Sequence, residues 1–276
     1  MQLSPGTEGS VVTGPSVPAR RRGPRRLPLA ARIALGVILP LAVLGVWQLI
    51  VVLHFLPAYR LPSPAGVVLA GVDLYNRGLL GHHIAISTQR VIIGFLSGSI
   101  VGLVIASLVG LSRSASLLLG PTLSALRAVP SLAWVPLLGL YLGIGEDSKV
   151  VLIAIGAFFP VFTTVSNALR HVDPQLLETG RAYGYTGTRL LGLVQLPAVV
   201  PSVISGLRLA LAQSWLFLVA GELLGASMGL GYLLVESQNN GRIDRLFLTI
   251  ILLGVLGIIT DALIGVLERY LLKRWG

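Results

Sequence analysis

The feature that most constrains this chain is its long stretches without a charged side chain. The first of them, Ile33 to Leu53, holds 21 uncharged residues in succession. A helix rises about 1.5 Å per residue, so this length crosses the roughly 30 Å hydrocarbon core of a bilayer. The apolar part of a secretory signal peptide is shorter, about 7–15 residues. The stretch therefore predicts a retained membrane span at about 33–53.

The composition extends this interpretation to the rest of the chain. Of the 276 residues, 54% are hydrophobic and 12% are charged, whereas soluble domains carry about 25% charged residues. Gly98 and Gly102 lie four residues apart in a second uncharged run, a spacing that lets membrane helices pack closely. The sequence predicts an all-α polytopic membrane protein with about six transmembrane helices. The later spans are expected at about 91–111, 126–145 (with 115–125 leading into it and Pro130 and Pro136 interrupting it), 149–169, 203–224 and 246–267.

The basic residues predict the orientation of these spans. The chain has 21 Lys and Arg against 11 Asp and Glu, a formal net charge of +10. With the N-terminus inside, thirteen basic residues fall on the cytoplasmic side and six on the outer side, as the positive-inside rule requires. Both termini are therefore expected in the cytoplasm. Residues 1–32, which include six arginines, are expected to form a disordered basic tail that contacts anionic lipid rather than nucleic acid.

The first outer loop, residues 54–90, contains a signal for the start of a helix. Ser63 precedes Pro64, which pairs a capping residue with a first-turn proline, and apolar residues recur behind them at helical spacing. Two structures fit this pattern: an amphipathic helix at the membrane interface and a plain surface connector.

The long inner loop, residues 170–202, has a more specific pattern. An Asp-Pro pair at 173–174 caps and opens a helix that is expected to run to Tyr183. Gly184 follows where a helix stops with positive φ. A second helix is expected over Thr188 to Gln195, ending at a proline. The pattern predicts a helix–glycine–helix hairpin, a shape suited to a groove on a partner.

The loop resembles the inner-loop signature of the permeases of binding-protein-dependent ABC importers. That signature is Glu-Ala-Ala, three residues, Gly, nine residues and Ile-x-Leu-Pro. Glu178 and Gly184 take the Glu and Gly positions, and after nine residues the chain reads Val-Gln-Leu196-Pro197. The departures are Thr179, Gly180 and Val194. A glycine in place of alanine is expected to loosen the first helix by up to about 1 kcal/mol.

The resemblance runs from about Leu61 to the C-terminus. Several further runs are similar to the branch that imports nitrate, sulfonates, taurine and bicarbonate: residues 61–64, 126–130, 143–146, 227–233 and 267–270 with Trp275. It implies a type I-like importer permease fold in the bacterial inner membrane, working as a homodimer with a separate ATPase and an extracytoplasmic solute-binding protein. The residues that it implies in coupling to the ATPase are Glu178, Gly180, Ala182, Gly184, Leu196 and Pro197.

The sequence carries no nucleotide-binding or catalytic motif of its own. Its two lysines, Lys149 and Lys273, stand in no Gly-Lys-Ser/Thr phosphate loop, so ATP is expected on a partner subunit and no cofactor on this one. The chain has no cysteine that would carry a lipid anchor, so the solute receptor is also expected to be separate. No metal site is expected, because the adjacent His82 and His83 would point about 100° apart on a helix.

Polar groups within the predicted spans are candidates for the transport pathway, since each is costly in a bilayer. Arg127 lies beside Pro130, where a broken helix can present a cation to an anion; the alternative is an anchor whose side chain reaches the inner surface. Glu222 is a candidate gate or a bundle partner, and for Asp261 we expect a packing or pairing role.

The expected function is uptake of a small anion of the sulfonate, nitrate or taurine type. An ABC permease for another small solute is one alternative. From a different class, an ion-gradient-driven secondary transporter would show inverted repeats and paired broken helices, and no such repeat stands out in this sequence.

Overall fold

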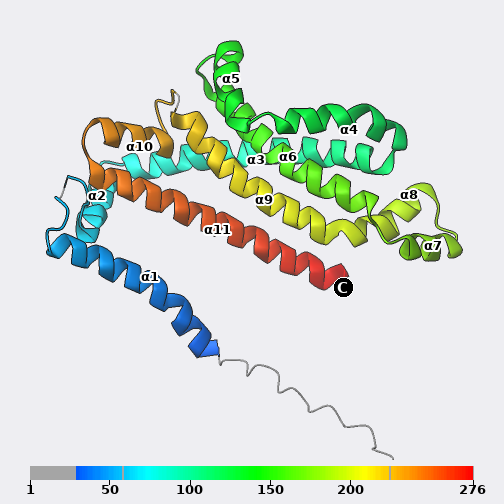
Figure 1. The fold of residues 1–276 in the computed structure, drawn as a ribbon, viewed down its shortest axis with the longest axis horizontal. Helices are drawn as coiled ribbons and strands as arrows, with labels where there is room; N and C mark the ends of the chain where they lie inside the picture. Colours follow the sequence, from blue (N-terminus) through cyan, green and yellow to red (C-terminus); the bar gives the residue numbers. More distant parts are fainter. Residues whose placement is uncertain (1–28, 58, 224, 276) are drawn as a thin grey trace, which may run out of the picture. The chain divides into compact units, whose positions relative to one another are not determined.

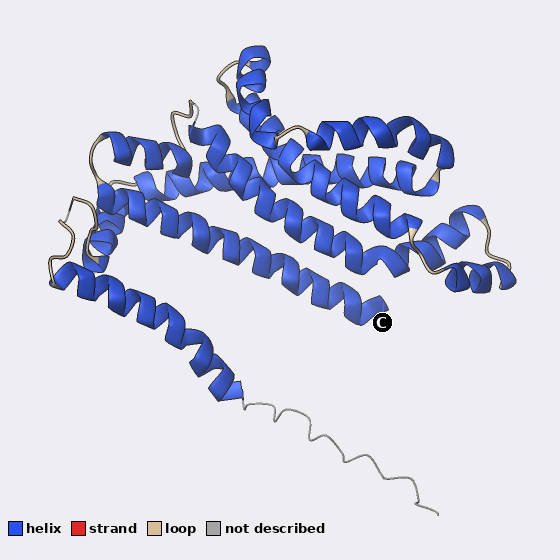
Figure 2. Cartoon of the chain, in the orientation of Figure 1, coloured by secondary structure: helices blue, strands red, loops and turns tan. Residues whose placement is uncertain are grey.

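The computed structural model describes residues 29–57, 59–223 and 225–275, and in these residues every regular element is a helix (Figure 2). The chain divides into two compact units, residues 1–46 and 47–276. The elements, of which Figure 1 labels the α-helices, are α1 (Leu29–Val52), α2 (Pro64–Asn76), α3 (Leu79–Leu111), α4 (Arg113–Ala128), the 3-10 turn η1 (Ser131–Ala133), α5 (Trp134–Leu142), α6 (Glu146–Arg170), α7 (Pro174–Ala182), α8 (Gly187–Leu190), the π-helical turn η2 (Leu191–Gln195), α9 (Leu196–Leu223), α10 (Leu230–Asn239) and α11 (Ile243–Trp275).

The first unit contains most of α1. This helix begins at Leu29, four residues before the predicted start of the first span, so residues 29–32 are helical and do not belong to the predicted tail. Pro40 lies within the helix, as prolines in membrane helices often do. The predicted basic tail otherwise falls in residues 1–28, outside the described residues.

The second unit is built around α3, α6 and α9, which pack side by side (Figure 1). The small-residue face predicted on α3 is confirmed: a Cβ on Gly98 would collide with the backbone of Ala154 in α6, and one on Gly102 would lie 3.0 Å from the carbonyl oxygen of Phe158. The absence of side chains therefore sets the close approach of α3 to α6. Buried apolar residues from the three helices fill the space between them, with Ile153, Val161 and Leu218 fully enclosed.

Helices α2, α10 and α11 complete this unit. The Ser63 hydroxyl accepts a hydrogen bond from the Gly66 amide at the start of α2, which confirms the predicted cap. Asp73 of α2 receives a hydrogen bond from Arg77 at 2.8 Å and one from Arg245 of α11 at 2.9 Å. These two guanidiniums hold the pKa of the Asp73 carboxyl below its usual value, and Arg77 has the larger effect.

Four of the predicted spans coincide with helices that are long and apolar enough to cross a membrane. These are Leu79–Leu111, Glu146–Arg170, Leu191–Leu223 and Ile243–Tyr270. Each of them begins before the predicted span, because the polar residues at three of the helix starts, and the prolines at the start near Leu191, do not end the helix. Gly36–Val52 is a shorter apolar helix.

The third predicted span, 126–145, is not one continuous helix: the interruption expected at Pro130 is present, whereas the one expected at Pro136 is wrong, because Pro136 lies in the first turn of α5. Helix α4 ends at Ala128, and Val129 is extended, with φ −67° and ψ 125°. A residue before proline is driven out of the helical region by the proline ring, so Pro130 ends α4. A 3-10 turn and the nine residues of α5 follow, and the expected lead-in, 115–125, is the body of α4.

Candidate functional site

The inner loop folds into the predicted hairpin. The Asp173 carboxylate accepts a hydrogen bond from the Gln175 amide, and Pro174 occupies the first turn of α7. Beyond Ala182 the chain turns at Gly184, whose φ is +81°. The amides of Gly184 and Tyr185 donate back to the carbonyls of Arg181 and Gly180, at 2.9 and 3.0 Å. This pair of bonds is the Schellman motif, in which glycine takes the left-handed position.

Gly180 has a packing role that the sequence did not predict. It is buried, and a Cβ there would lie 2.7 Å from Leu190 and 3.0 Å from Val194. The glycine that departs from the signature's alanine therefore lets α7 lie directly against α8 and η2. The glycine is expected to lower the helix propensity of α7, and it also allows this close contact between the two helices of the hairpin.

The second helix of the hairpin continues further than expected. It was predicted to end at Pro197, but α8 passes through η2 into α9 without a break. The Leu196 amide donates to the Leu191 carbonyl in an i to i−5 pattern. Because Pro197 has no N–H to donate, the π turn directly before it accommodates the proline.

The hairpin presents residues that a partner can contact. Glu178, Ala182 and Gly184 are all exposed at its surface. Tyr183 is 77% exposed, and Leu176 is 48% exposed. Leu196 is partly exposed, and Pro197 is half-buried at the start of α9.

Arg127 lies at the end of α4, one residue before the helix stops. Its side chain is exposed, and Nη1 lies 3.4 Å from the Thr163 hydroxyl of α6. Two cavities, of about 330 and 320 Å³, are both lined by Arg127 and Thr163. Pro130, predicted with Arg127, forms the break itself.

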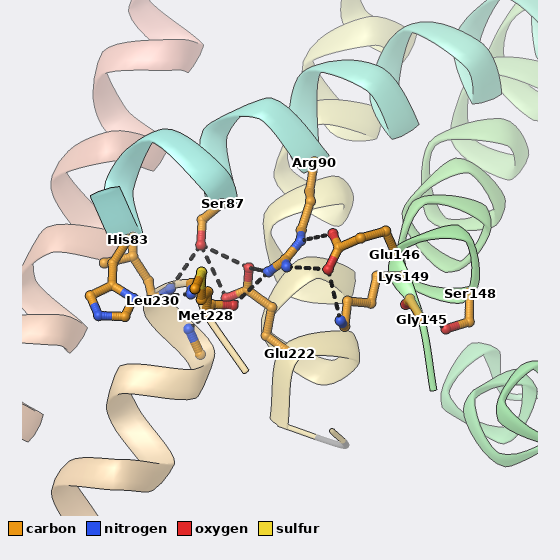
Figure 3. A network of polar contacts seen from close by, with 12 residues as sticks. His83, Ser87, Arg90, Gly145, Glu146, Ser148, Lys149, Glu222, Met228 and Leu230 are labelled. Atoms are coloured by element: carbon orange, nitrogen blue, oxygen red, sulfur yellow. Dashed lines mark hydrogen bonds and ion pairs between the residues drawn. The ribbon is translucent and has the colours of Figure 1, made fainter. Parts of the chain in front are cut away.

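Glu222 belongs to a polar cluster at the end of the second unit opposite the hairpin. Figure 3 shows this cluster, the Arg90 network, which consists of Ser87, Arg90, Glu146, Lys149 and Glu222. Arg90 Nη1 donates to Glu222 at 2.6 Å, while its Nε and Nη2 donate to the two oxygens of Glu146, also at 2.6 Å. The Glu222 side chain is 0% exposed and that of Arg90 is 5% exposed.

The Arg90 network connects the ends of several helices to one loop. Ser87 donates to Glu222 and Lys149 donates to Glu146, so two cations balance two carboxylates. The amide of Gly231 donates to Glu222 at 2.6 Å, and Arg90 donates to the Met228 carbonyl at 2.8 Å. The network therefore joins α3, α6 and α9 to the loop that leads into α10.

Sequence reasoning did not identify Arg90, although a signal was present. Arg90 was counted only as a basic residue of the outer loop. Its position matches the face of α3 that Ser87, Gly94 and Gly98 occupy, at spacings of three and four residues. A charged residue on the close-packing face of a helix requires a buried partner, and Glu222 is that partner.

A second ion-pair group joins α9 to α11. Arg208 donates to Asp261 through Nε at 2.9 Å and through Nη2 at 2.5 Å, and to Glu268 at 3.3 Å. The pairing role expected for Asp261 is confirmed. Arg208 and Glu222, 14 residues apart on α9, each pair with a different neighbouring helix.

These features define a class of protein: a helical, multi-pass membrane protein with a glycine-turned hairpin between two of its spanning helices. Residues 98–273 match the family described as the inner membrane component of binding-protein-dependent transport systems. The chain belongs to this family of inner-membrane transport components.

Relatives and solved structures agree with this assignment. The chain is 40% identical to a Bacillus subtilis (strain 168) protein named "Putative aliphatic sulfonates transport permease protein SsuC", over 86% of each chain. It is 28% identical to the taurine transport system permease protein TauC of Escherichia coli (strain K12), over 91% of this chain and 93% of TauC. A chain in an inward-facing structure of the MetNI methionine ABC transporter shares the fold, with a TM-score of 0.59 at 20% identity, covering 67% of this chain and 92% of that one.

Proposed function

We propose that this chain is the permease subunit of an ABC importer for small organic sulfonates such as alkanesulfonates and taurine. The observation that supports the solute most directly is the 40% identity, over 86% of the chain, to the SsuC relative. The TauC relative supports the same class of solute, because taurine is also a sulfonate. The transported group would be a singly charged, tetrahedral –SO₃⁻.

The energy would come from a separate ATPase docked on the α7–α8 hairpin. The geometry supports this role: Glu178, Ala182 and Gly184 are exposed, and Tyr183 presents an apolar ring beside them. Gly180 allows the two helices of the hairpin to pack closely, and Leu196 and Pro197 join the hairpin to α9. A movement of the hairpin caused by the ATPase would therefore be transmitted directly to α9.

The pathway would form between two copies of the chain supplied by an extracytoplasmic solute-binding protein. Arg127 and Pro130, at the α4–α5 break, are the proposed pathway residues, supported by the two cavities that Arg127 lines. Glu222 is enclosed by the Arg90 network in this conformation. We infer that it acts at the outer gate by fixing the loop before α10 rather than by direct contact with solute.

Uptake by the reconstituted transporter tests this function. The chain is placed in proteoliposomes with a candidate ATPase and a candidate solute-binding protein from the same organism, and uptake of radiolabelled taurine and ethanesulfonate is measured with and without ATP inside. We expect uptake that requires ATP and persists when ionophores collapse ion gradients. Uptake that survives without ATP but stops with the gradient would indicate a secondary transporter, and uptake of neither sulfonate would reject the solute class.

A further inference from the structure

A polar cavity lies between α4 and the second half of α6. Arg127 of α4 contacts Thr163 of α6 at one end, and Arg170 of α6 donates to the Ser116 hydroxyl of α4, at 2.9 Å, at the other end. These two contacts show that the helices run antiparallel past the cavity. Its volume is about 330 Å³, near the lower limit of small-molecule sites.

Each helix contributes a polar stripe to this cavity. On α4, Ser116, Ser124 and Arg127 recur at helical spacing, and on α6 Thr163, Asn167 and Arg170 do the same. Residues spaced by three, four, seven, eight or eleven positions lie on one side of a helix. The two stripes face each other across the cavity. Each helix also has apolar faces that are available for packing.

Among the residues that the structure describes, no carboxylate offsets the positive charge of this cavity. The described residues that line it include two arginines, hydroxyls and an amide. Within residues 29–57, 59–223 and 225–275, the ion pairs of the structure involve other arginines and not Arg127 or Arg170. Arg127 and Arg170 are both exposed and both line the cavity, so a solute can reach them.

A guanidinium binds tetrahedral oxyanions through parallel N–H donors, and neighbouring hydroxyl and amide groups supply further donors. We propose that this cavity, the α4–α6 cavity, is a binding site for the oxyanion group of a sulfonate or phosphate, with Arg127 and Arg170 as its two cationic ends. Ser116 lies eleven positions before Arg127 on α4, about 16 Å along the helix axis, so an anion held between the two ends of the cavity is attracted by both guanidiniums.

The second cavity explains how an anion would arrive there. It lies between α6 and α9, has a volume of about 320 Å³, and shares Arg127 and Thr163 with the α4–α6 cavity. Thr164 and Gln213 add polar groups to its lining. Arg127 therefore stands at the junction of the two cavities, and Arg170 stands at the end nearest the hairpin.

The choice of a transported sulfonate as the occupant rests on the proposed function, whereas the oxyanion chemistry of the cavity does not. A phospholipid headgroup offers the same chemistry. The test therefore separates the two sources with the full-length chain, purified in detergent and in lipid nanodiscs. Ethanesulfonate is the soluble probe, and the uncharged ethyl methyl sulfone is its control. Native mass spectrometry reports any phospholipid that the chain retains.

Three variants make the test specific. Arg127→Gln and Arg170→Gln each remove one cation, and Arg113→Gln removes an exposed arginine of α4 that does not line the cavity. A hydrogen-bonded charge contributes enough that its loss should weaken binding about ten- to a hundredfold. Arg127→Lys, which keeps the charge but not the paired donors, should lie between Arg127→Gln and the wild type. Thermal melting of each variant reports whether it is folded.

We expect ethanesulfonate, but not the sulfone, to bind the wild type and Arg113→Gln, and to bind Arg127→Gln and Arg170→Gln weakly. A phospholipid retained by the same two proteins and lost from the other two supports the oxyanion site and identifies lipid as its occupant. Equal binding by all folded variants overturns the proposal. Uptake assays separate it from the proposed function: unchanged import of ethanesulfonate by Arg127→Gln and Arg170→Gln rejects a cargo site while the transport function stands.

Discussion

At the scale of single residues, the Arg90–Glu222 pair carries the sharpest prediction for stability. Replacing Glu222 with Ala would leave the Arg90 Nη1 group, the Ser87 hydroxyl and the Gly231 amide without their buried acceptor. Removal of one partner of a buried ion pair costs about 3–5 kcal/mol. We expect a clear fall in the thermal melting midpoint of the purified chain.

The matched control is Asp147→Ala, which removes an exposed carboxylate one residue from Glu146. It should change the melting midpoint little, since exposed charges contribute about 0–1 kcal/mol. If Glu222→Ala and Asp147→Ala melt alike, the Arg90 network is not a stabilising element.

Gly229 gives a second prediction at this scale. Its φ is +117°, and a Cβ there would collide with the Glu222 carboxylate. Gly229→Ala should therefore disturb both the backbone and the network. Gly241 also has positive φ, +66°, but faces open space, so Gly241→Ala carries only the backbone cost of about 1–2 kcal/mol. Melting curves should show a larger loss for Gly229→Ala; equal losses would show that Glu222 moves aside without cost.

The Arg90–Glu222 pair also shows which part of a buried ion pair can be predicted from sequence. Glu222 was found because a carboxylate inside a span is conspicuous. Arg90, its partner, is 132 positions away along the chain, and pairing at that distance follows from how α3 and α9 pack. Spacing on one helix predicts a face, but it does not predict which residue of another helix meets that face.

At the scale of elements, the turn of the hairpin tests whether coupling depends on the backbone conformation at Gly184 or on the glycine itself. Gly184 has φ +81° and open space around its Cα, so only backbone conformation restricts it. Gly184→Val places a β-branched residue in the left-handed region, where it is strongly disfavoured, whereas Gly184→Asn is tolerated there. We expect ATP-driven uptake to be lost in the Val variant and largely kept in the Asn variant, with both present in the membrane.

Co-purification of the ATPase is the second readout for these hairpin variants. Full uptake by Gly184→Val, with the ATPase still bound, would remove the hairpin from the coupling route. Loss of uptake in both variants would instead show that the turn requires glycine itself.

The α3–α6 contact supplies a prediction for helix packing. Gly98→Val would drive a side chain into the backbone of Ala154, whereas a Cβ at Gly81 on the same helix has nothing within 4 Å. Overpacking of this kind costs about 1–3 kcal/mol. The Gly98 variant should therefore melt at a lower temperature and give less folded protein, and the Gly81 variant should match the wild type. Equal melting would mean that α3 and α6 separate easily.

Elements were predictable where local rules decide them. The caps at Ser63 and Asp173 and the turn at Gly184 depend on neighbouring residues alone, and the sequence was sufficient for them. The interruption at Pro130 was predicted, but the interruption expected at Pro136 and the end of the second hairpin helix at Pro197 were not correct. In both cases a proline lies in an apolar run, and whether such a proline ends a helix depends on the surrounding backbone contacts.

At the scale of the whole molecule, the remaining prediction is the orientation in the membrane. The predicted topology places the hairpin and both termini in the cytoplasm and the α10–α11 turn outside. Because the chain has no cysteine, single cysteines can be introduced without altering any native thiol. Thr186 in the hairpin and Asn240 at the α10–α11 turn are both exposed, and Ala157 is fully buried.

We expect a membrane-impermeant maleimide added to whole cells to label Asn240→Cys but not Thr186→Cys, and to label both after the membrane is opened. Ala157→Cys should react in neither case until the protein is denatured. Labelling of Thr186→Cys from outside would invert the topology and place the hairpin beyond the reach of a cytoplasmic ATPase. The proposed direction of transport depends on this result, because the hairpin and the Arg90 network lie at opposite ends of the same three-helix core.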